Sequence, residues 1–247
     1  MEIYILWLRQ IKRYLRSKSR IIGSLGQPLL FLLALGYGLG PIFQRAGEGS
    51  YIEFLAPGII AMSILFTSIF SGIEIIWDRQ FGFLKEIMVA PVPRFTIMIG
   101  RTFGGATVAT IQGMIVFLIS LVVGFRPTSI SALPAAVLVM GLIALLFTAL
   151  GTAVASMLED FQGFQLIMNF MVMPLFFLSG ALFPLSGLPK IVAQVTTINP
   201  LSYGVDALRG LLTNKYHFGL PLDLLVLSGI TFICLLIGSY LFSRIEL

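Results

Sequence analysis

Charged side chains are scarce in this sequence. Asp, Glu, Lys and Arg together make up 11% of its 247 residues, whereas soluble domains carry roughly 25% charged residues. Hydrophobic residues make up 57%, and a chain so apolar cannot cover a water-facing surface. The composition therefore excludes a soluble globular protein and makes a lipid bilayer the expected solvent.

Cysteine and histidine are almost absent, with one residue of each, Cys234 and His217. A single cysteine cannot form a disulfide framework, and Cys234 lies in an apolar run, where we expect it to be a packing residue. A single histidine excludes H-E-x-x-H and every two-histidine metal site. We therefore expect no metal site, and we assign no role to His217, which we place in an outer loop.

Motifs for phosphate binding and for nucleophilic catalysis are also missing. No glycine is followed by lysine, which excludes the P-loop G-x-x-x-x-G-K-[ST]. The sequence contains no G-x-S-x-G, and no nucleophile can be recognised together with an orienting base. We therefore expect no catalytic residue and no cofactor on this chain, which would make it a protein that is not itself an enzyme.

What the sequence has instead is six long apolar runs. Each is long enough to cross ~30 Å of hydrocarbon as a helix. Short loops account for most of the remainder, so we predict a single domain over 1–247, an all-α integral membrane protein with six transmembrane helices. The predicted spans are 21–43, 55–77, 96–123, 133–157, 164–185 and 221–242.

The N-terminal segment 1–20 is basic and amphipathic. Its apolar residues recur at helical spacing and Lys and Arg fill the gaps, a pattern typical of a helix that lies in the headgroup layer. We predict an interfacial helix over 1–20 whose basic side faces anionic lipid; the alternative is a basic tail that only fixes the topology. The residues assigned to the membrane surface are Trp7, Arg9, Lys12, Arg13 and Arg16.

The basic residues are unevenly distributed over this topology. With six spans both termini lie on one side, and that side holds eleven Lys and Arg against five on the other. Cytoplasmic loops carry an excess of Lys and Arg, so we predict that both termini are cytoplasmic. Topology and anionic lipid then explain the net charge of +5, and nucleic acid is not an expected partner.

The predicted cytoplasmic loop after the second span has a helical pattern of its own. Apolar residues recur at i, i+3, i+6 and i+7 from Phe81 to Met88, and Pro91 ends the pattern. A short amphipathic helix within 78–94 could transmit motion from a docked protein into the membrane. The alternative is an ordinary interfacial loop, and the pattern alone does not decide between them.

The predicted outer segment 186–220 is too apolar for a solvated loop of its length. We expect short re-entrant helices there, with their backbone buried in protein. Gly180 allows close backbone approach, and Pro184 and Pro189 end the fifth span and begin the re-entrant segment.

Two further signals lie in this outer segment. Asn199-Pro200 is a turn signal that can also start a helix. Asp206 and Arg209 are three residues apart and could pair on one helix face.

Few polar groups fall inside the predicted spans. Glu74 is either a pathway residue, as intramembrane carboxylates often are, or a residue near the cytoplasmic end that reaches the interface or pairs with Arg79 or Arg101. We favour the second interpretation of Glu74. Gln112 and Asn169 are expected to hydrogen-bond between helices.

Two pairs of glycines have the spacing G-x-x-x-G, Gly36 with Gly40 and Gly100 with Gly104. This spacing lets two helices approach closely. We expect these contacts within one chain rather than at a seam between two copies.

Several of these motifs together resemble the permease of ABC-2 type transporters, over nearly the whole length and in the same order. That family has an acidic–basic pair after its second span, then a glycine, then a proline followed by a basic residue. Asp78-Arg79, Gly82, Pro91 and Arg94 stand in those places. The family often has Glu-Arg followed by Gly-Thr, and Asp78 and Phe83 depart from that pattern.

The outer segment carries the stronger part of the resemblance. The family has a Ser-Gly-Phe-Pro-like end to its fifth span, and Ser179-Gly180 with Pro184 match it here. It also has an Asn-Pro-leading segment that ends in arginine, which Asn199-Pro200 and Arg209 match.

The resemblance implies a function that composition and spacing do not give. It implies a transmembrane permease subunit of an exporter in a bacterial or archaeal inner membrane, paired with a second permease copy, in the simplest case an identical one. Two cytoplasmic ABC ATPase subunits would bind ATP and magnesium and drive transport through a coupling helix. Related systems export drugs, lipids or lipid-linked glycans, and we expect a hydrophobic or amphipathic cargo.

The resemblance also assigns residues to two sites. The residues assigned to ATPase coupling are Asp78, Arg79, Gly82, Leu84, Lys85, Glu86, Pro91, Arg94, Glu159 and Asp160. The residues assigned to the outer re-entrant motif are Ser179, Gly180, Pro184, Pro189, Asn199, Pro200, Asp206 and Arg209.

Two other classes of membrane protein remain as alternatives. An ion-coupled carrier or channel usually needs several ionisable groups at mid-membrane, and the predicted spans offer Glu74 and little else. A membrane enzyme acting on lipid would need His, Asp and Ser clustered at one membrane level, which the sequence does not provide.

The predicted orientation can be tested by labelling single cysteines. In a Cys234→Ser background, a membrane-impermeant thiol reagent applied to intact cells should label Lys190→Cys and should not label Lys85→Cys. Labelling in the opposite pattern would overturn the predicted orientation.

Overall fold

The computed structural model describes residues 2–45, 49–83, 92–185 and 189–245. Within these ranges the chain is helical and has no β-strand. The helices are α1 Glu2–Arg16, α2 Lys18–Arg45, α3 Tyr51–Phe70, α4 Ile73–Gln80, α6 Arg94–Val123, α7 Leu133–Met157, α8 Phe161–Phe177, α9 Lys190–Ile198, α10 Pro200–Thr213 and α11 Leu220–Ser243, with a 3-10 turn η1 at Ile130–Ala132.

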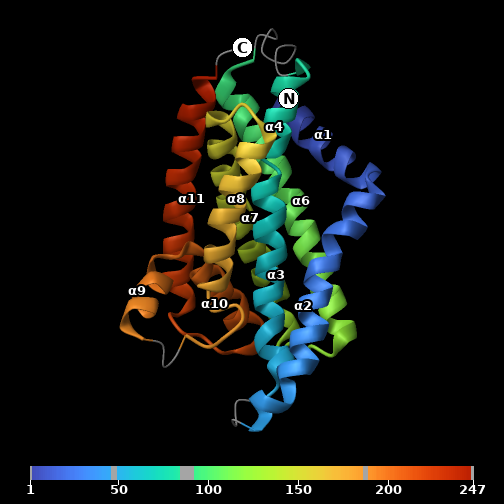
Figure 1. The fold of residues 1–247 in the computed structure, drawn as a ribbon, viewed down its shortest axis with the longest axis vertical. Coiled ribbons are helices and arrows are strands. Elements are labelled where there is room, and N and C mark those ends of the chain that lie inside the picture. Colours follow the sequence, from blue (N-terminus) through green and yellow to red (C-terminus); the bar gives the residue numbers. More distant parts are fainter. Residues whose placement is uncertain (1, 46–48, 84–91, 186–188, 246–247) are drawn as a thin grey trace.

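The long helices run side by side along the longest axis of the molecule (Figure 1). The N-terminus, α4 and the end of α11 lie at one end, and α9 and α10 lie at the other. Five segments are long and apolar enough to span a membrane, and they match five of the six predicted spans. These segments are Lys18–Arg45, Tyr51–Gln80, Arg94–Val123, Ile130–Met157 and Leu220–Ser243.

The fifth predicted span, 164–185, is wrong in its bounds. Helix α8 begins earlier, at Phe161, and ends at Phe177 after 17 residues. At 1.5 Å per residue it is about 25 Å long, shorter than the ~30 Å hydrocarbon core. The chain then turns, with Gly180 at φ +72°, a conformation that glycine adopts without a steric penalty.

Helix α3 is the centre of the bundle, and it contacts α2, α6, α7, α8 and α10. Its sequence is apolar on nearly every side, which is the pattern of a helix buried by its neighbours. Most of its residues from Leu55 to Ile69 are buried. Because α4 follows after a short turn at residues 71–72, the central helix leads directly to the end of the molecule that holds both termini.

The pattern of the N-terminal segment predicted a single helix over 1–20, and the structure differs from this prediction. Helix α1 ends at Arg16 and α2 begins at Lys18. Helix α1 packs against α6, where a Cβ at Gly100 or Gly104 would lie within 3 Å of side-chain carbons of Leu6 and Gln10.

The two glycine pairs differ in what they contact. The prediction of a contact within one chain is confirmed for Gly100 and Gly104, which face α1. Gly36 lies against the side chain of Ile52 on α3, whereas no atom lies within 4 Å of a Cβ placed on Gly40. The second glycine of the first pair therefore contributes no close contact within the described chain.

One very close backbone approach is between α7 and the junction of α3 with α4. A Cβ at Gly151 would lie 2.5 Å from the carbonyl oxygen of Ile69, and one at Gly72 would lie 2.5 Å from the carbonyl oxygen of Gly151. Both obstacles are backbone atoms, so the helices must separate to admit even a methyl group.

This packing predicts opposite effects for two glycine-to-alanine changes. Gly151→Ala should destabilise the protein by about 1–3 kcal/mol, the usual cost of overpacking. Gly229→Ala in α11, where no atom lies within 4 Å, should be neutral or stabilise by up to about 1 kcal/mol. Thermal unfolding of both variants in one detergent measures the difference, and equal behaviour would contradict the packing described here.

Candidate functional site

Helix α4 carries two buried carboxylates, Glu74 and Asp78. Arg20 of α2 donates to Glu74 at 2.8 Å, and Arg13 of α1 lies 3.6 Å from the same carboxylate. Pairing was one of the arrangements expected for Glu74, but the partners named for it are wrong, because Glu74 pairs with Arg20 and Arg13 instead of Arg79 or Arg101.

The second carboxylate, Asp78, forms an ion pair with Arg101 of α6, and Arg9 of α1 lies 3.6 Å from it. The Arg101 side chain is 4% exposed, and its Nε and Nη1 have no hydrogen-bond partner. A buried charge without a partner is very costly, so the pair with Asp78 is essential to the placement of Arg101.

We call these six residues, Arg9, Arg13, Arg20, Glu74, Asp78 and Arg101, the inner charge cluster. It joins four helices, α1, α2, α4 and α6, at the end of the bundle that holds the termini. Four arginines face two carboxylates, so the cluster has an excess of two positive charges among its described side chains.

The inner charge cluster changes the role expected for Asp78. It was assigned to ATPase coupling, yet its side chain is 8% exposed and pairs inside the bundle. It also lies in the last turn of α4, rather than at the start of a helix over 78–94. The assignment of Asp78 to ATPase coupling stays a prediction, and the contacts of its carboxylate within the described residues are with Arg101 and Arg9.

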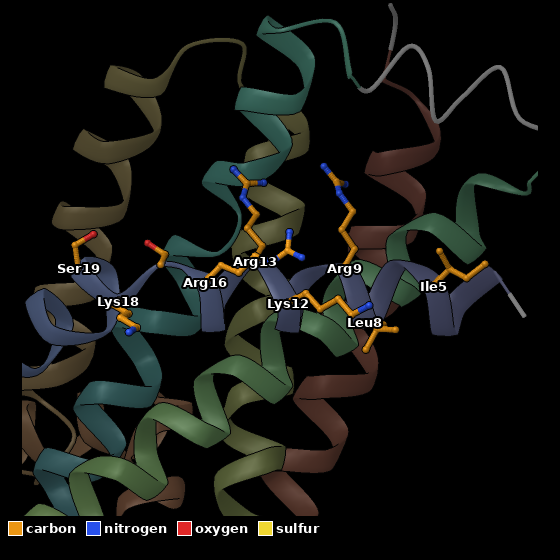
Figure 2. A pocket seen from close by; sticks show the side chains of 9 residues that line it. Ile5, Leu8, Arg9, Lys12, Arg13, Arg16, Lys18 and Ser19 are labelled. Atoms are coloured by element: carbon orange, nitrogen blue, oxygen red, sulfur yellow. The ribbon is translucent and has the colours of Figure 1, made fainter.

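The basic side of the N-terminal segment was predicted to face anionic lipid, but part of it also forms contacts inside the bundle. Figure 2 shows Arg9 and Arg13 projecting from α1 in the same direction, and their guanidinium groups approach Asp78 and Glu74 rather than pointing only outward to lipid. Trp7 donates from its Nε1 to Thr107 of α6 at 3.0 Å.

Other basic residues of the N-terminal segment remain accessible. Lys12 and Arg16 are exposed, and they line an open groove of about 960 Å³ along α1 (Figure 2). These two residues can therefore still face anionic lipid, as predicted for the whole basic side.

Next to this cluster, the end of α4 meets the short loop between α7 and α8. Arg79 donates to Glu159 at 2.9 Å, and the Gln80 side chain donates to the Glu159 carbonyl oxygen at 3.1 Å. The rings of Trp77 and Phe161 stack 6.0 Å apart. Two segments that were assigned to the same coupling site from sequence therefore lie side by side.

The remaining coupling residues are spread over this end of the molecule. Asp160 caps α8 by accepting from the Gly163 amide. Gly82 is half-buried at φ +76°, with no atom within 4 Å of a Cβ placed on it, and Arg94 donates to the carbonyl oxygen of Ile245 at 3.2 Å. The predicted coupling residues Leu84, Lys85, Glu86 and Pro91 lie outside the described residues.

At the opposite end, Arg209 of α10 holds the turn that follows α8. Its Nη2 donates to the Gly180 carbonyl oxygen at 2.8 Å, and its guanidinium carbon lies 4.0 Å from the ring centroid of Phe54. Burial lowers the pKa of Arg209 to about 10, and the Asp206 carboxylate opposes this shift. Arg209 therefore stays charged at neutral pH and joins α10, α3 and the Gly180 turn.

The predicted pair of Asp206 with Arg209 is wrong. The Asp206 carboxylate accepts from the backbone amides of His217, Phe218 and Gly219 at 2.7 to 3.3 Å. It therefore fixes the turn between α10 and α11. The i, i+3 spacing places both residues on one helix, but each is satisfied by a different segment of the chain.

The other outer residues shape the helix ends. Asn199 caps α10 by accepting from the Leu201 amide, and its Nδ2 donates to the Leu175 carbonyl oxygen at 2.7 Å. Pro200 follows as the first residue of α10, as predicted for a helix start. Ser179 and Pro184 lie in the turn after α8, where the Ser179 hydroxyl donates to the Phe176 carbonyl oxygen. Pro189 directly precedes α9.

Three residues that matter here were missed or undervalued from sequence. The sequence suggested for Arg20 only a role in topology, and for Arg101 only a possible pairing with Glu74. Both arginines are far from α4 along the chain, so the sequence does not reveal that Arg20 pairs with Glu74 and Arg101 with Asp78. Asp223, in the first turn of α11, is fully buried and lies beside the Asp206 carboxyl group. A carboxylate inside an apolar run was the available signal for Asp223.

Comparison with known proteins gives an independent result. The family profile described as ABC-2 type transporter matches residues 1–213, from α1 to the end of α10. Nodulation protein J of Rhizobium meliloti (strain 1021) is 31% identical over 213 residues, covering 84% of this chain and 80% of that protein. The putative transport permease ycf38 of Porphyra purpurea is 30% identical over 220 residues, covering 86% and 74%, and that of Cyanophora paradoxa is 27% identical over 221 residues, covering 87% and 75%.

The fold and the two polar sites define a class, a helical membrane protein with several helices long and apolar enough to span a bilayer and with charged contacts at both ends of its bundle. Within that class the chain belongs to the ABC-2 type transporter family. The resemblance read from its motifs is thereby confirmed, and its relatives include proteins named as transport permeases.

The inner charge cluster makes a prediction about stability. Asp78→Asn leaves the buried Arg101 without its counter-charge and should cost about 3–5 kcal/mol. Glu159→Gln removes a surface partner whose side chain is 80% exposed, and it should cost no more than about 1 kcal/mol.

Denaturant unfolding of both variants in detergent measures these costs. If Asp78→Asn were no more destabilising than Glu159→Gln, the ion pair of Asp78 with Arg101 would not be essential to the stability of the fold.

Proposed function

We propose that this chain is the transmembrane permease subunit of an ATP-driven exporter whose ATPase is a separate polypeptide. The observation that carries the proposal is the contact between the end of α4 and the 158–160 loop through Arg79 and Glu159. Family membership supports the same function. Two loops at one end of the bundle together offer a surface that a cytoplasmic ATPase can push.

The route from that surface into the membrane follows from the contacts. A force on residues after Gly82 acts first on α4, which is fixed to α1 and α2 through Glu74 and to α6 through Asp78. Because α4 follows the central helix α3 after one short turn, the same displacement reaches the bundle core. ATP and magnesium would act on the partner ATPase, and this chain would supply coupling and pathway.

Six crossings with both termini in the cytoplasm belong to the proposal. Five long helices alone would leave the termini at opposite ends, whereas the N-terminus and the end of α11 lie at the same end (Figure 1). Helix α8 with the turn after it supplies the additional pass. Helices α9 and α10 at the far end then act as re-entrant outer elements, in a bacterial or archaeal inner membrane.

The exposed face of α8 supports a second permease copy. Gln162, Gln165 and Asn169 lie on exposed positions of this helix at i, i+3 and i+7. Asn169 is exposed, so its hydrogen bond to another helix stays a prediction. Amides facing lipid would lack hydrogen-bond partners, so this face is better suited to an identical copy or to a cargo between two copies.

The cargo proposed is hydrophobic or amphipathic, such as a drug, a lipid or a glycan-linked lipid. The exposed face of α8 combines those amides with large apolar side chains. Leu166 and Phe170 are 72% and 84% exposed. A pathway with this composition can contact both hydroxyl groups and hydrocarbon.

One observation favours the alternative of an ion-coupled carrier. Asp223 is buried beside the Asp206 carboxyl group, and ionisable groups in such positions often move ions. Glu74, the carboxylate on which that alternative rested, is instead held by two arginines. The exporter remains the better supported function, because family membership and the contact of α4 with the 158–160 loop both support it.

The exporter can be tested with the complex itself. The chain, produced with the ATPase encoded beside it, should co-purify with that ATPase and should move cargo in vesicles only when ATP is hydrolysed. Transport by the permease alone, driven by an ion gradient, would overturn the proposal and favour the carrier.

The coupling surface predicts a specific effect at Gly82. Gly82→Ala forces alanine into a positive-φ conformation that costs roughly 1–2 kcal/mol, so it should distort the chain after α4 and lower ATP-driven transport. Gly49→Ala is the matched control, because Gly49 has φ +83° and open space around it but lies before α3, at the other end of that helix.

Both variants should insert into the membrane at wild-type levels, measured by detergent-extracted yield. Equal transport by both would remove the segment after α4 from the mechanism.

A further inference from the structure

A cavity of about 220 Å³ lies between α2 and α3, apart from the coupling surface. It begins at Arg20, next to the inner charge cluster, and extends along α2 to Gln27 and Pro28. On the α3 side it runs from Phe70 to Met62. Eight residues of helix correspond to about 12 Å, so the cavity is long enough for part of an extended molecule.

A buried hydroxyl group faces this cavity without a partner. Ser63 is 3% exposed, it lines the cavity, and its Oγ makes no hydrogen bond. An unsatisfied buried hydroxyl costs about 1–3 kcal/mol. A ligand oxygen in the cavity would accept from Ser63 and remove that cost.

Positive charge is concentrated at the Arg20 end. Arg20 and Tyr14 line both this cavity and a smaller neighbouring one that contains Arg101. The inner charge cluster has four arginines against two carboxylates, and Nε and Nη1 of Arg101 are unpaired. An anionic group at this end would offset the excess charge.

The rest of the cavity wall is mixed in polarity. Met62 and Phe66 of α3 and Pro28 of α2 are apolar, and Ser24, Gln27 and Thr67 add polar side chains. The cavity therefore has a cationic end, a partly apolar wall and an unpartnered hydroxyl group at Ser63.

We propose that this cavity binds an anionic amphiphile, with its acidic head group at Arg20 and its chain against Met62 and Phe66. An ester or hydroxyl oxygen of the ligand accepts from Ser63. The site goes beyond the proposed exporter function, because binding needs no ATPase. The ligand chemistry is shared by an acidic membrane phospholipid and by an acidic lipid-like cargo.

Two glycines of α2 accept a large side chain without a backbone clash, and one of them lies at the cavity. Gly23 lines the cavity, and no atom lies within 4 Å of a Cβ placed on it. Gly23→Trp therefore adds an indole ring at the cavity wall without a clash at its Cβ. Gly26→Trp is the matched control, since Gly26 is equally open, lies on the same helix and is not part of the cavity wall.

The probe is phosphatidylglycerol, compared with phosphatidylcholine. The full complex is delipidated, incubated with either lipid in detergent, and analysed by native mass spectrometry. Wild type and Gly26→Trp should retain phosphatidylglycerol in preference to phosphatidylcholine, and Gly23→Trp should retain at least about tenfold less of it. Equal retention by the three proteins, or no preference for the anionic lipid, would overturn the proposal.

A second variant separates binding from stability. Ser63→Ala removes the unpartnered hydroxyl, so the lipid-free protein should unfold at the same or a higher temperature, while phosphatidylglycerol retention falls about 2- to 10-fold. If Ser63→Ala lowered the unfolding temperature and left retention unchanged, the hydroxyl would be structural and the proposal would be wrong.

Mass spectrometry of lipids extracted from the complex as it comes from cells distinguishes the two sources. A phospholipid or a glycan-linked acidic lipid that is lost in Gly23→Trp supports the proposal in either case, and absence of any acidic amphiphile contradicts it. The ATPase should remain bound to Gly23→Trp, so failure of this site and failure of the exporter proposal give different results.

Discussion

The ion pair between Asp78 and Arg101 is the contact on which the rest of the structure depends. Both side chains are less than one-tenth exposed, and a charge at that depth is tolerated only beside an opposite charge. The pair fixes α4 against α6, and Glu74 on the same helix holds α1 and α2 through Arg13 and Arg20. These ion pairs fix the orientation of α1, α2, α4 and α6 relative to one another, which apolar packing alone would not do.

The central helix connects this cluster with the opposite end of the bundle. Helix α3 leads into α4 at one end, and near its other end Phe54 packs under the Arg209 guanidinium. Arg209 in turn holds the turn at Gly180, which follows α8. In the proposed exporter, α3 is therefore the element through which movement at the ATPase surface reaches the outer helices, and the α2–α3 cavity lies along that element.

Local sequence signals predicted the long helices well, because a span needs only a run of apolar residues, and they placed the start of α10 at Asn199-Pro200. They failed at the end of α8, because the segment 178–183 is apolar enough to continue a transmembrane helix. Hydropathy cannot distinguish a buried turn from the end of a span. They also failed on charge partners. Glu74 pairs with Arg20 and Arg13, and that choice depends on which helices become neighbours. The i, i+3 spacing of Asp206 and Arg209 was a local signal that more distant groups overrode.

The central claim is that α1 and α4 move as one unit because the inner charge cluster joins them. Spin labels at the exposed residues Lys12 and Gln80 measure the distance between α1 and α4, and a third label at Ser243 reports on α11. Pulsed electron paramagnetic resonance of the complex, without nucleotide and with ATP trapped, should give an unchanged Lys12–Gln80 distance and a changed Gln80–Ser243 distance. A Lys12–Gln80 distance that changes with ATP in the transport-active complex would contradict the account.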